Sequence, residues 1–323
     1  MAKLAILVGC CYPDDPDRLE GCYNDVETMK ELLTTRCGFP PKNVVVLTDK
    51  LDSPLRPTGG IIRSAIDWMI EQAKAGDVLL FYFAGHGKFD DFGKGWGCIR
   101  EEFIVPCDRN LIYSVDFRAM VNRIPQGAHL TIIADSCNSG GLIEMLKEQV
   151  GPGFPPHVCY TPRAYDYSPL YKPRLMPMTA IVRYLESRSG LNSPDIGRHL
   201  RHIYGNDVSI KFRGQADHHA QVNASHQPVD QLDDKGILIS ACQFDESSLD
   251  IRGVRRPHGV FTAVLSESVK EEPGPISYKL LVEKCRAKIE LFAEKYRAKI
   301  ERPPHPCLYC SDENVNAPFL QNR

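Results

Sequence analysis

Two motifs at the ends of apolar segments carry residues suited to nucleophilic chemistry. F-A-G-H-G places His86 just after one apolar segment, and D-S-C-N-S-G-G places Cys137 just after another. A cysteine protease needs a thiolate nucleophile, a histidine that moves protons, and backbone N–H donors for the oxyanion. The neighbouring glycines let a substrate approach closely. The pair therefore favours a Cys–His hydrolase over an inert cysteine and an ordinary strand-end histidine.

Strand-like and helix-like segments alternate through the chain around these motifs. Continuous apolar or β-branched runs predict strands at 3–9, 43–49, 77–84, 102–108, 129–135 and 236–243. Amphipathic runs predict helices at 26–37, 61–74 and 116–124. Asn24 or Asp25 can cap the first helix and Thr58 the second, and Ser114 begins the third.

Continuous apolar strands between amphipathic helices predict an α/β fold, with a mostly parallel central sheet covered by helices on both faces. Ligands of such sheets bind beyond the carboxyl ends of the strands. His86 and Cys137 both follow such ends, so we expect the two side chains to meet there.

Bulk composition excludes some partners. The net charge of −2 gives no electrostatic argument for a nucleic acid, and no apolar run approaches the ~18 residues of a spanning helix. The N-terminus has no small-x-small cleavage site after its short apolar run. Twelve cysteines in 323 residues, several inside predicted strands and helices, favour reduced thiols. We expect a cytoplasmic monomer without a membrane anchor.

The composition changes between residues 151 and 178, where seven prolines and four tyrosines accompany three basic residues. This pattern is typical of an irregular, partly extended linker. It divides the chain into a large catalytic part (1–150), the linker (151–178) and a smaller C-terminal part (179–323) that completes the same fold.

Several motifs together resemble the metacaspases, specifically the plant type II group with a short linker. The separation of His86 and Cys137, 137 − 86 = 51, is close to the spacing of about 50 that is known for caspases. The resemblance runs from residue 6 to residue 312 and is carried, in chain order, by V-G-C-C-Y-P, G-C-Y-N-D, F-A-G-H-G, E-F-I-V-P-C-D, D-S-C-N-S-G-G, G-I-L-I-S-A-C-Q and H-P-C-L-Y-C-S-D.

The resemblance implies a caspase-like fold and an endopeptidase that cleaves protein or peptide substrates after exposed arginine or lysine. It assigns His86 as general base and acid and Cys137 as nucleophile. It also assigns the backbone N–H groups of Gly87 and Cys137 to the oxyanion hole. The implied pocket for the basic side chain comprises Asp25, Asp135, Cys22 and Ala84. Two carboxylates suit a guanidinium or ammonium and exclude acidic side chains.

The sequence leaves open the role of Asp25 and the effect of two departures from the family pattern. Asp25 can be the cap of the first helix, a pocket residue, or both. Ala84 and Asn138 stand where family members usually have serine and histidine, which puts substrate fine-tuning in doubt. A catalytically impaired caspase-fold interaction protein is therefore the alternative to an active protease.

The linker adds an activation mechanism. Metacaspases of this group resemble zymogens that are cut after a basic residue, and P-R-L-M-P-M-T-A-I-V places that cut after Arg174. Lys172 and Arg163 are alternatives. We expect the segment to occupy the acidic pocket until self-cleavage; a plain proline-rich spacer is the other interpretation.

Two metal sites also need weighing. Calcium prefers six to eight oxygen ligands with little competing positive charge, but Lys88 and other basic residues lie among the four candidates Asp90, Asp91, Glu101 and Glu102. We expect weak calcium binding or a solvated loop, and no required cofactor. A structural zinc site needs four ligands, and H-P-C-L-Y-C offers only His305, Cys307 and Cys310. The resemblance to the metacaspases implies a strand at C-L-Y-C, which is the better interpretation.

Overall fold

A computed structural model describes most of the chain, namely residues 1–90, 101–137, 139–143, 146–151, 170–213, 236–243, 246–295 and 303–321. No helix within these ranges is long and apolar enough to cross a membrane.

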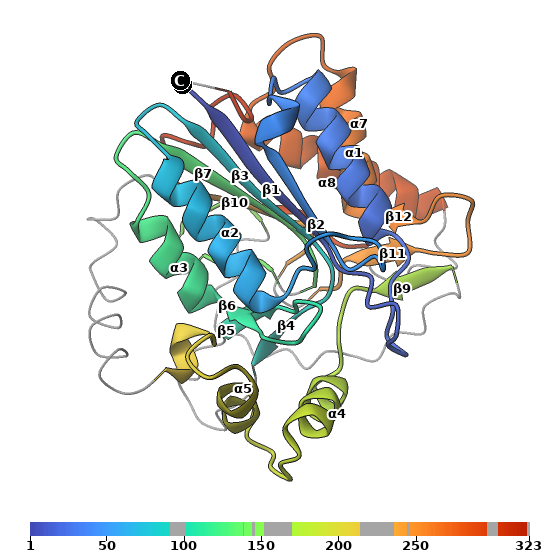
Figure 1. The fold of residues 1–323 in the computed structure, drawn as a ribbon. Helices are drawn as coiled ribbons and strands as arrows, with labels where there is room; N and C mark the ends of the chain where they lie inside the picture. Colours follow the sequence, from blue (N-terminus) through green and yellow to red (C-terminus); the bar gives the residue numbers. More distant parts are fainter. Residues whose placement is uncertain are drawn as a thin grey trace.

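A seven-stranded sheet forms the centre of the fold, in the order β2-β1-β3-β7-β10-β13-β8 (Figure 1). The first five of these strands are parallel to one another. They are β1 (Lys3–Gly9), β2 (Val44–Thr48), β3 (Val78–Ala84), β7 (His129–Asp135) and β10 (Gly236–Ser240). β13 (Cys307–Tyr309) is antiparallel to β10, and β8 (Glu148–Val150) is antiparallel to β13. Five of the six predicted strands therefore form the parallel part of this sheet, whereas the strand predicted at 102–108 belongs to a separate antiparallel sheet.

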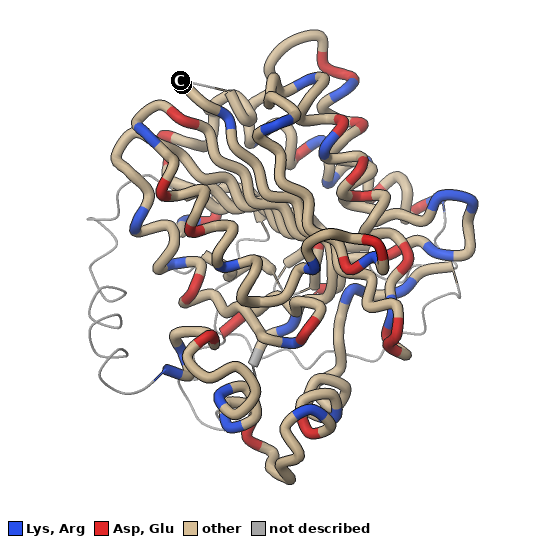
Figure 2. The backbone as a smooth tube through the Cα atoms, viewed as in Figure 1, with Lys and Arg blue, Asp and Glu red and all other residues tan. Residues whose placement is uncertain are grey.

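Helices cover both faces of this sheet (Figure 1). α2 (Gly59–Gln72) and α3 (Ser114–Asn122) lie on one face. α1 (Cys22–Thr35), α7 (Val260–Glu271) and α8 (Tyr278–Lys295) lie on the other. Figure 2 shows the same layering in the charges, which follow the helices and loops while the central strands carry almost none. The predicted α/β class is confirmed.

Shorter elements surround the carboxyl ends of the sheet. Two small sheets have the strand orders β4-β5-β6 and β12-β11-β9. Their strands are β4 (Gly87–Asp90), β5 (Glu101–Ile104), β6 (Ile112–Tyr113), β9 (Tyr171–Pro173), β11 (Leu249–Ile251) and β12 (His258–Gly259). The remaining described helices are α4 (Met178–Ser189), α5 (Ile196–Tyr204) and the 3₁₀ turns η1 (Pro41–Asn43) and η2 (Ile210–Phe212).

The helix starts test the predicted caps. Thr58 caps α2, with its hydroxyl accepting from the N–H of Ile61 at 3.2 Å, and α3 begins at Ser114 as predicted. The cap predicted for the first helix is wrong. α1 begins at Cys22, and Gly21 precedes it without a side-chain cap. Asp25 therefore lies inside the first turn and its carboxylate is free for another role.

Candidate active site

The strand register brings the two predicted dyad residues to one edge of the sheet. Ala84 at the end of β3 is paired with Asp135 at the end of β7. His86 and Cys137 each follow two residues later, and both side chains are fully buried.

His86 is oriented by contacts from the segment that follows β1. Its ring stacks on Tyr12 with centroids 4.8 Å apart, and its backbone N–H donates to the Tyr12 hydroxyl at 2.9 Å. The ring Nε2 lies 2.7 Å from the carbonyl oxygen of Asp17. A carbonyl oxygen only accepts, so Nε2 carries the proton. Nδ1 of the neutral ring is then the basic nitrogen, and it has no partner among the described residues.

Burial keeps both members of the dyad uncharged in this arrangement. Desolvation raises the pKa of the Cys137 thiol to about 12 and lowers the pKa of His86 to about 3. The Cys137 thiol donates to the carbonyl oxygen of Ser248, with 3.6 Å between sulfur and oxygen. The pair at rest is a neutral thiol and a neutral imidazole.

The backbone of Arg174 occupies the space in front of this dyad. Its carbonyl oxygen accepts from the N–H of Gly87 at 3.0 Å and from the N–H of Cys137 at 3.3 Å. These are the two donors assigned to the oxyanion hole. Two backbone N–H groups on one carbonyl, next to a thiol, are the geometry that acyl transfer requires.

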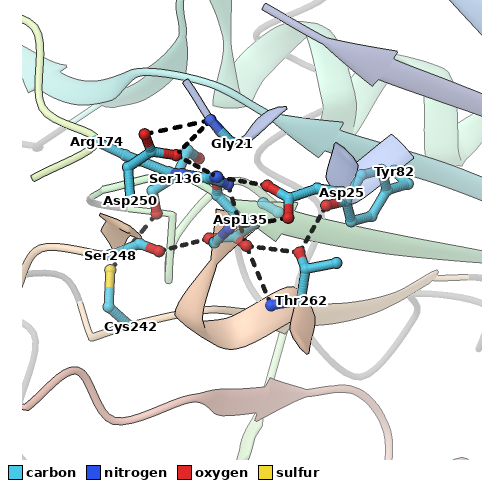
Figure 3. A network of polar contacts seen from close by, with 12 residues as sticks. Gly21, Asp25, Tyr82, Asp135, Ser136, Arg174, Cys242, Ser248, Asp250 and Thr262 are labelled. Atoms are coloured by element: carbon cyan, nitrogen blue, oxygen red, sulfur yellow. Dashed lines mark hydrogen bonds and ion pairs between the residues drawn. The ribbon is translucent and has the colours of Figure 1, made fainter. Parts of the chain in front are cut away.

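The side chain of Arg174 fills an acidic pocket (Figure 3). One terminal nitrogen, Nη2, pairs with Asp25 and, at 2.9 Å, with Asp250. The other, Nη1, lies 3.1 Å from the Asp135 carboxylate and also donates to the Asp135 carbonyl at 3.1 Å. All four side chains are fully buried. A buried guanidinium with this many charge-assisted hydrogen bonds is held specifically.

Each pocket carboxylate is fixed by further donors. Asp25 accepts from the N–H of Gly259 at 2.8 Å. Asp135 accepts from the Thr262 hydroxyl at 2.6 Å and from the Ser248 hydroxyl at 2.5 Å. Asp250 accepts from the N–H groups of Glu20 and Gly21 at 2.9 and 3.1 Å.

Comparison with known proteins identifies the family. Residues 3–146 match the family described as "Metacaspase, peptidase C14 domain". Metacaspase-9 of Arabidopsis thaliana is 38% identical over 322 residues, which cover 98% of this chain and 96% of the relative. Metacaspase-6 of the same plant is 32% identical and covers 99% and 100%. The chain belongs to the metacaspase family.

Solved structures confirm the caspase-like fold of this metacaspase. "Protein GSU0716 from Geobacter sulfurreducens" superposes with a TM-score of 0.62 at 17% identity, covering 100% of this chain and 99% of that one. "Caspase-1 from Spodoptera frugiperda" superposes with a TM-score of 0.51 at 11% identity, covering 95% and 85%. At these identities the likeness concerns the fold alone.

The other predicted pocket residues lie near the arginine without the same contacts. Cys22 is fully buried in the first turn of α1. Burial raises the pKa of its thiol well above the ordinary value, and the nearby charge of Arg174 offsets only part of this rise. Its sulfur and one oxygen each of Asp25 and Asp250 lie within 4.8 Å of one another. Ala84 supplies only a buried methyl group at the end of β3. Asn138 lies outside the described residues.

Sequence reasoning missed three residues of this site. Asp250 is the third carboxylate on Arg174, and Ser248 accepts the N–H of Arg174 at 2.8 Å through its carbonyl. Both follow from the pairing of β9 with β11, which no sequence motif indicated. Tyr12 stands in the quoted motif V-G-C-C-Y-P, and its φ of 52° marks an unusual turn that the sequence does not reveal.

Of the two alternative cleavage residues, the structure describes only Lys172, which does not enter the pocket. The Lys172 ammonium donates to the carbonyl of Arg18 at 3.0 Å, outside the acidic pocket. Arg163 lies outside the described residues, as does most of the linker.

The calcium prediction falls partly outside the described residues, which include neither the Asp90 side chain nor Asp91. Glu101 forms an ion pair with Lys211. Glu102 is buried and accepts from the N–H of Gly141 at 2.6 Å. Both glutamates thus have partners within the protein, and calcium binding stays a prediction.

The zinc candidates have other partners too. Cys307 lies in β13, as the strand interpretation of C-L-Y-C expected. His305 pairs with Glu246 at 2.5 Å, and the Cys307 thiol lies 3.3 Å from the His305 carbonyl. In the part of the chain that the structure describes, these residues form no group with metal-ligand spacing. The ten cysteines described there form no disulfide.

Proposed function

We propose that this metacaspase is a cysteine endopeptidase that cleaves after arginine or lysine and that its first substrate is its own linker, cut after Arg174. The observation that carries the proposal is the placement of one residue. Arg174 has its side chain on three carboxylates and its carbonyl on the N–H groups of Gly87 and Cys137.

The reaction follows from the groups around that carbonyl. His86 Nδ1 accepts the thiol proton while the Cys137 sulfur attacks the carbonyl carbon of Arg174. The negative charge that develops on the oxygen is stabilised by the two N–H donors. The imidazolium then protonates the nitrogen of Leu175 as the peptide bond breaks. Water, deprotonated by the same histidine, hydrolyses the thioester and regenerates the thiol.

The pocket accounts for the choice of substrate. Three buried carboxylates around one cation favour arginine, whose two terminal nitrogens reach them together, and accept the single ammonium of lysine. An acidic side chain would be repelled by the ionised carboxylates of this pocket and is excluded. Proteins and peptides with exposed basic residues are therefore the proposed substrates. Ten described cysteines without a disulfide favour a reducing, cytoplasmic compartment.

Hydrolysis of three fluorogenic peptides ending in Arg, Lys or Asp tests the proposal. The wild type should cleave the Arg and Lys peptides and leave the Asp peptide intact. Cys137→Ala should lower kcat/KM by about 10³-fold or more. Cys285→Ala, which removes another fully buried thiol in α8, is the matched control and should retain activity. Equal rates for wild type and Cys137→Ala would refute the proposal.

A further inference from the structure

One exposed loop contacts both the linker and the catalytic histidine. The loop runs from Pro13 to Arg18 and follows β1. The Lys172 ammonium donates to the carbonyl of Arg18 at 3.0 Å and to the carbonyl of Pro16 at 3.5 Å. Between them, the carbonyl of Asp17 lies on Nε2 of His86 at 2.7 Å. Three consecutive carbonyls of the loop thus face either the substrate cation or the catalytic ring.

The position of Lys172 is set by the register of the bound strand. β9 is antiparallel to β11, with Lys172 opposite Asp250, and the N–H of Arg174 donates to Ser248. Any peptide that binds in this register places its residue two positions before the cleaved arginine against the same loop. The Lys172 side chain is only 15% exposed there, and the Asp17 carboxylate lies 3.9 Å from its ammonium.

The loop has its own anchors at both ends. The N–H of Asp15 donates to the Tyr12 carbonyl at 2.9 Å, and the N–H of Leu19 donates to the Cys11 carbonyl at 2.9 Å. Asp15 also pairs with Arg109. Pro16 is exposed and Asp17 is half-buried. The Lys172 ammonium contacts the backbone carbonyls on either side of Asp17. A cation at this place therefore restrains the part of the loop that orients His86.

We propose that a basic residue two positions before the cleaved arginine positions the catalytic histidine. By binding the carbonyls of Pro16 and Arg18 it fixes the Asp17 carbonyl, which keeps the proton on Nε2 and the basic lone pair on Nδ1 of His86. The inference rests on the proposed function and deepens it. Substrates with a basic residue at this position should therefore have a higher kcat, in addition to any effect on KM.

Arginine should serve at this position as well as lysine. A cavity of about 240 Å³ adjoins Lys172 and is lined by Asp15, Pro16, Arg18, Glu20 and Arg252. It leaves room for the larger guanidinium, whose several N–H groups can donate to the same loop carbonyls.

Four coumarin peptides test the inference on enzyme whose linker has been cleaved. The reference is acetyl-Tyr-Lys-Pro-Arg, which copies residues 171–174. Norleucine in place of Lys keeps the aliphatic chain and removes the charge; it should lower kcat about 10-fold while KM changes less than about 3-fold. Arg in place of Lys should restore kcat to within about 2-fold.

The fourth peptide is the matched control, with Ala in place of Tyr. Tyr171 packs edge-on against Phe292 of α8, with centroids 6.1 Å apart. This peptide should raise KM and leave kcat within about 2-fold. Its behaviour separates lost binding from lost positioning.

The outcomes distinguish the inference from the function on which it rests. A norleucine peptide that raises only KM, or that matches the reference in both constants, overturns the positioning role while the protease assignment stands. Failure to hydrolyse any of the four peptides overturns the proposed function itself. In the intact chain, Lys172→Met should slow concentration-independent self-cleavage about 10-fold and Lys172→Arg should not; equal rates for both overturn the inference.

Discussion

Three carboxylates and one guanidinium share a fully buried pocket, and this imbalance of charge affects the protonation of single residues. With all groups ionised the pocket would carry two uncompensated negative charges. Burial raises the pKa of Asp25 to about 7, opposed by the charge of Arg174 and reinforced by that of Asp135. The native chain therefore keeps a proton on Asp25 that an unfolded chain releases near pH 4.

The sign of the resulting pH dependence is fixed. Between about pH 4 and pH 7 the folded state binds the extra proton, so the contribution of Asp25 to stability falls as pH rises. An asparagine at position 25 cannot release a proton, so the Asp25→Asn variant of the uncut Cys137→Ala protein should not lose this stability. Its unfolding free energy relative to the parent should rise by ~1–3 kcal/mol as the pH increases from 5 to 8. Urea titrations of both proteins measure this. A difference that is constant with pH would contradict a raised pKa for Asp25.

At the scale of elements, the glycine before α7 makes the arginine pocket. A Cβ at Gly259 would lie 2.3 Å from the Asp135 carboxylate and 2.8 Å from the guanidinium carbon of Arg174. At Gly274, which follows the other end of α7 and is exposed, a Cβ would meet nothing within 4 Å. The two glycines flank the same helix, but only Gly259 contacts the pocket.

Gly259→Ala should therefore block the pocket. We expect kcat/KM for Arg and Lys peptides to fall by about 100-fold or more, because the methyl group takes the place of the cation. Gly274→Ala should stay within about 2-fold of wild type. Circular dichroism of both variants checks that the fold persists. A fully active Gly259→Ala enzyme would contradict the assignment of the pocket.

Elements also explain how far the sequence could go. The long strands 3–9 and 129–135 and the cap Thr58 were predictable because apolar runs and hydroxyl caps are local signals. Their order brings His86 and Cys137 to one edge. The strands β9, β11 and β12 have two or three residues each, and β9 pairs with β11 only when segments about 80 residues apart meet. Asp250 acquires its role through that pairing, so no local pattern predicted it. Asp25 looked like a cap, but the helix began three residues earlier.

At the scale of the whole molecule, the two parts beside the linker build one sheet. β10 of the C-terminal part pairs with β7 of the N-terminal part over five residues. In return, β8 of the N-terminal part pairs with β13 of the C-terminal part. Leu238 and Ile239 of β10 are fully buried. A cut in the linker breaks none of these contacts.

The cut protein should therefore stay together. We expect both fragments of the self-cleaved enzyme to elute as one species in gel filtration at the volume of the uncut Cys137→Ala chain, because separation would expose the apolar faces of β7 and β10. Denaturing gels of the same fractions reveal the two fragments. Fragments that elute separately without denaturant would contradict a shared core.

The most direct test of the central claim is the position of the first cut. Intact-mass measurement and N-terminal sequencing of self-cleaved wild type should give a fragment that begins at Leu175. Arg174→Gln should prevent that cut, whereas Arg163→Gln should leave it unchanged, and Cys137→Ala should stay uncut. A first cut after another residue, or cleavage between Arg174 and Leu175 in the Cys137→Ala chain, would contradict the account.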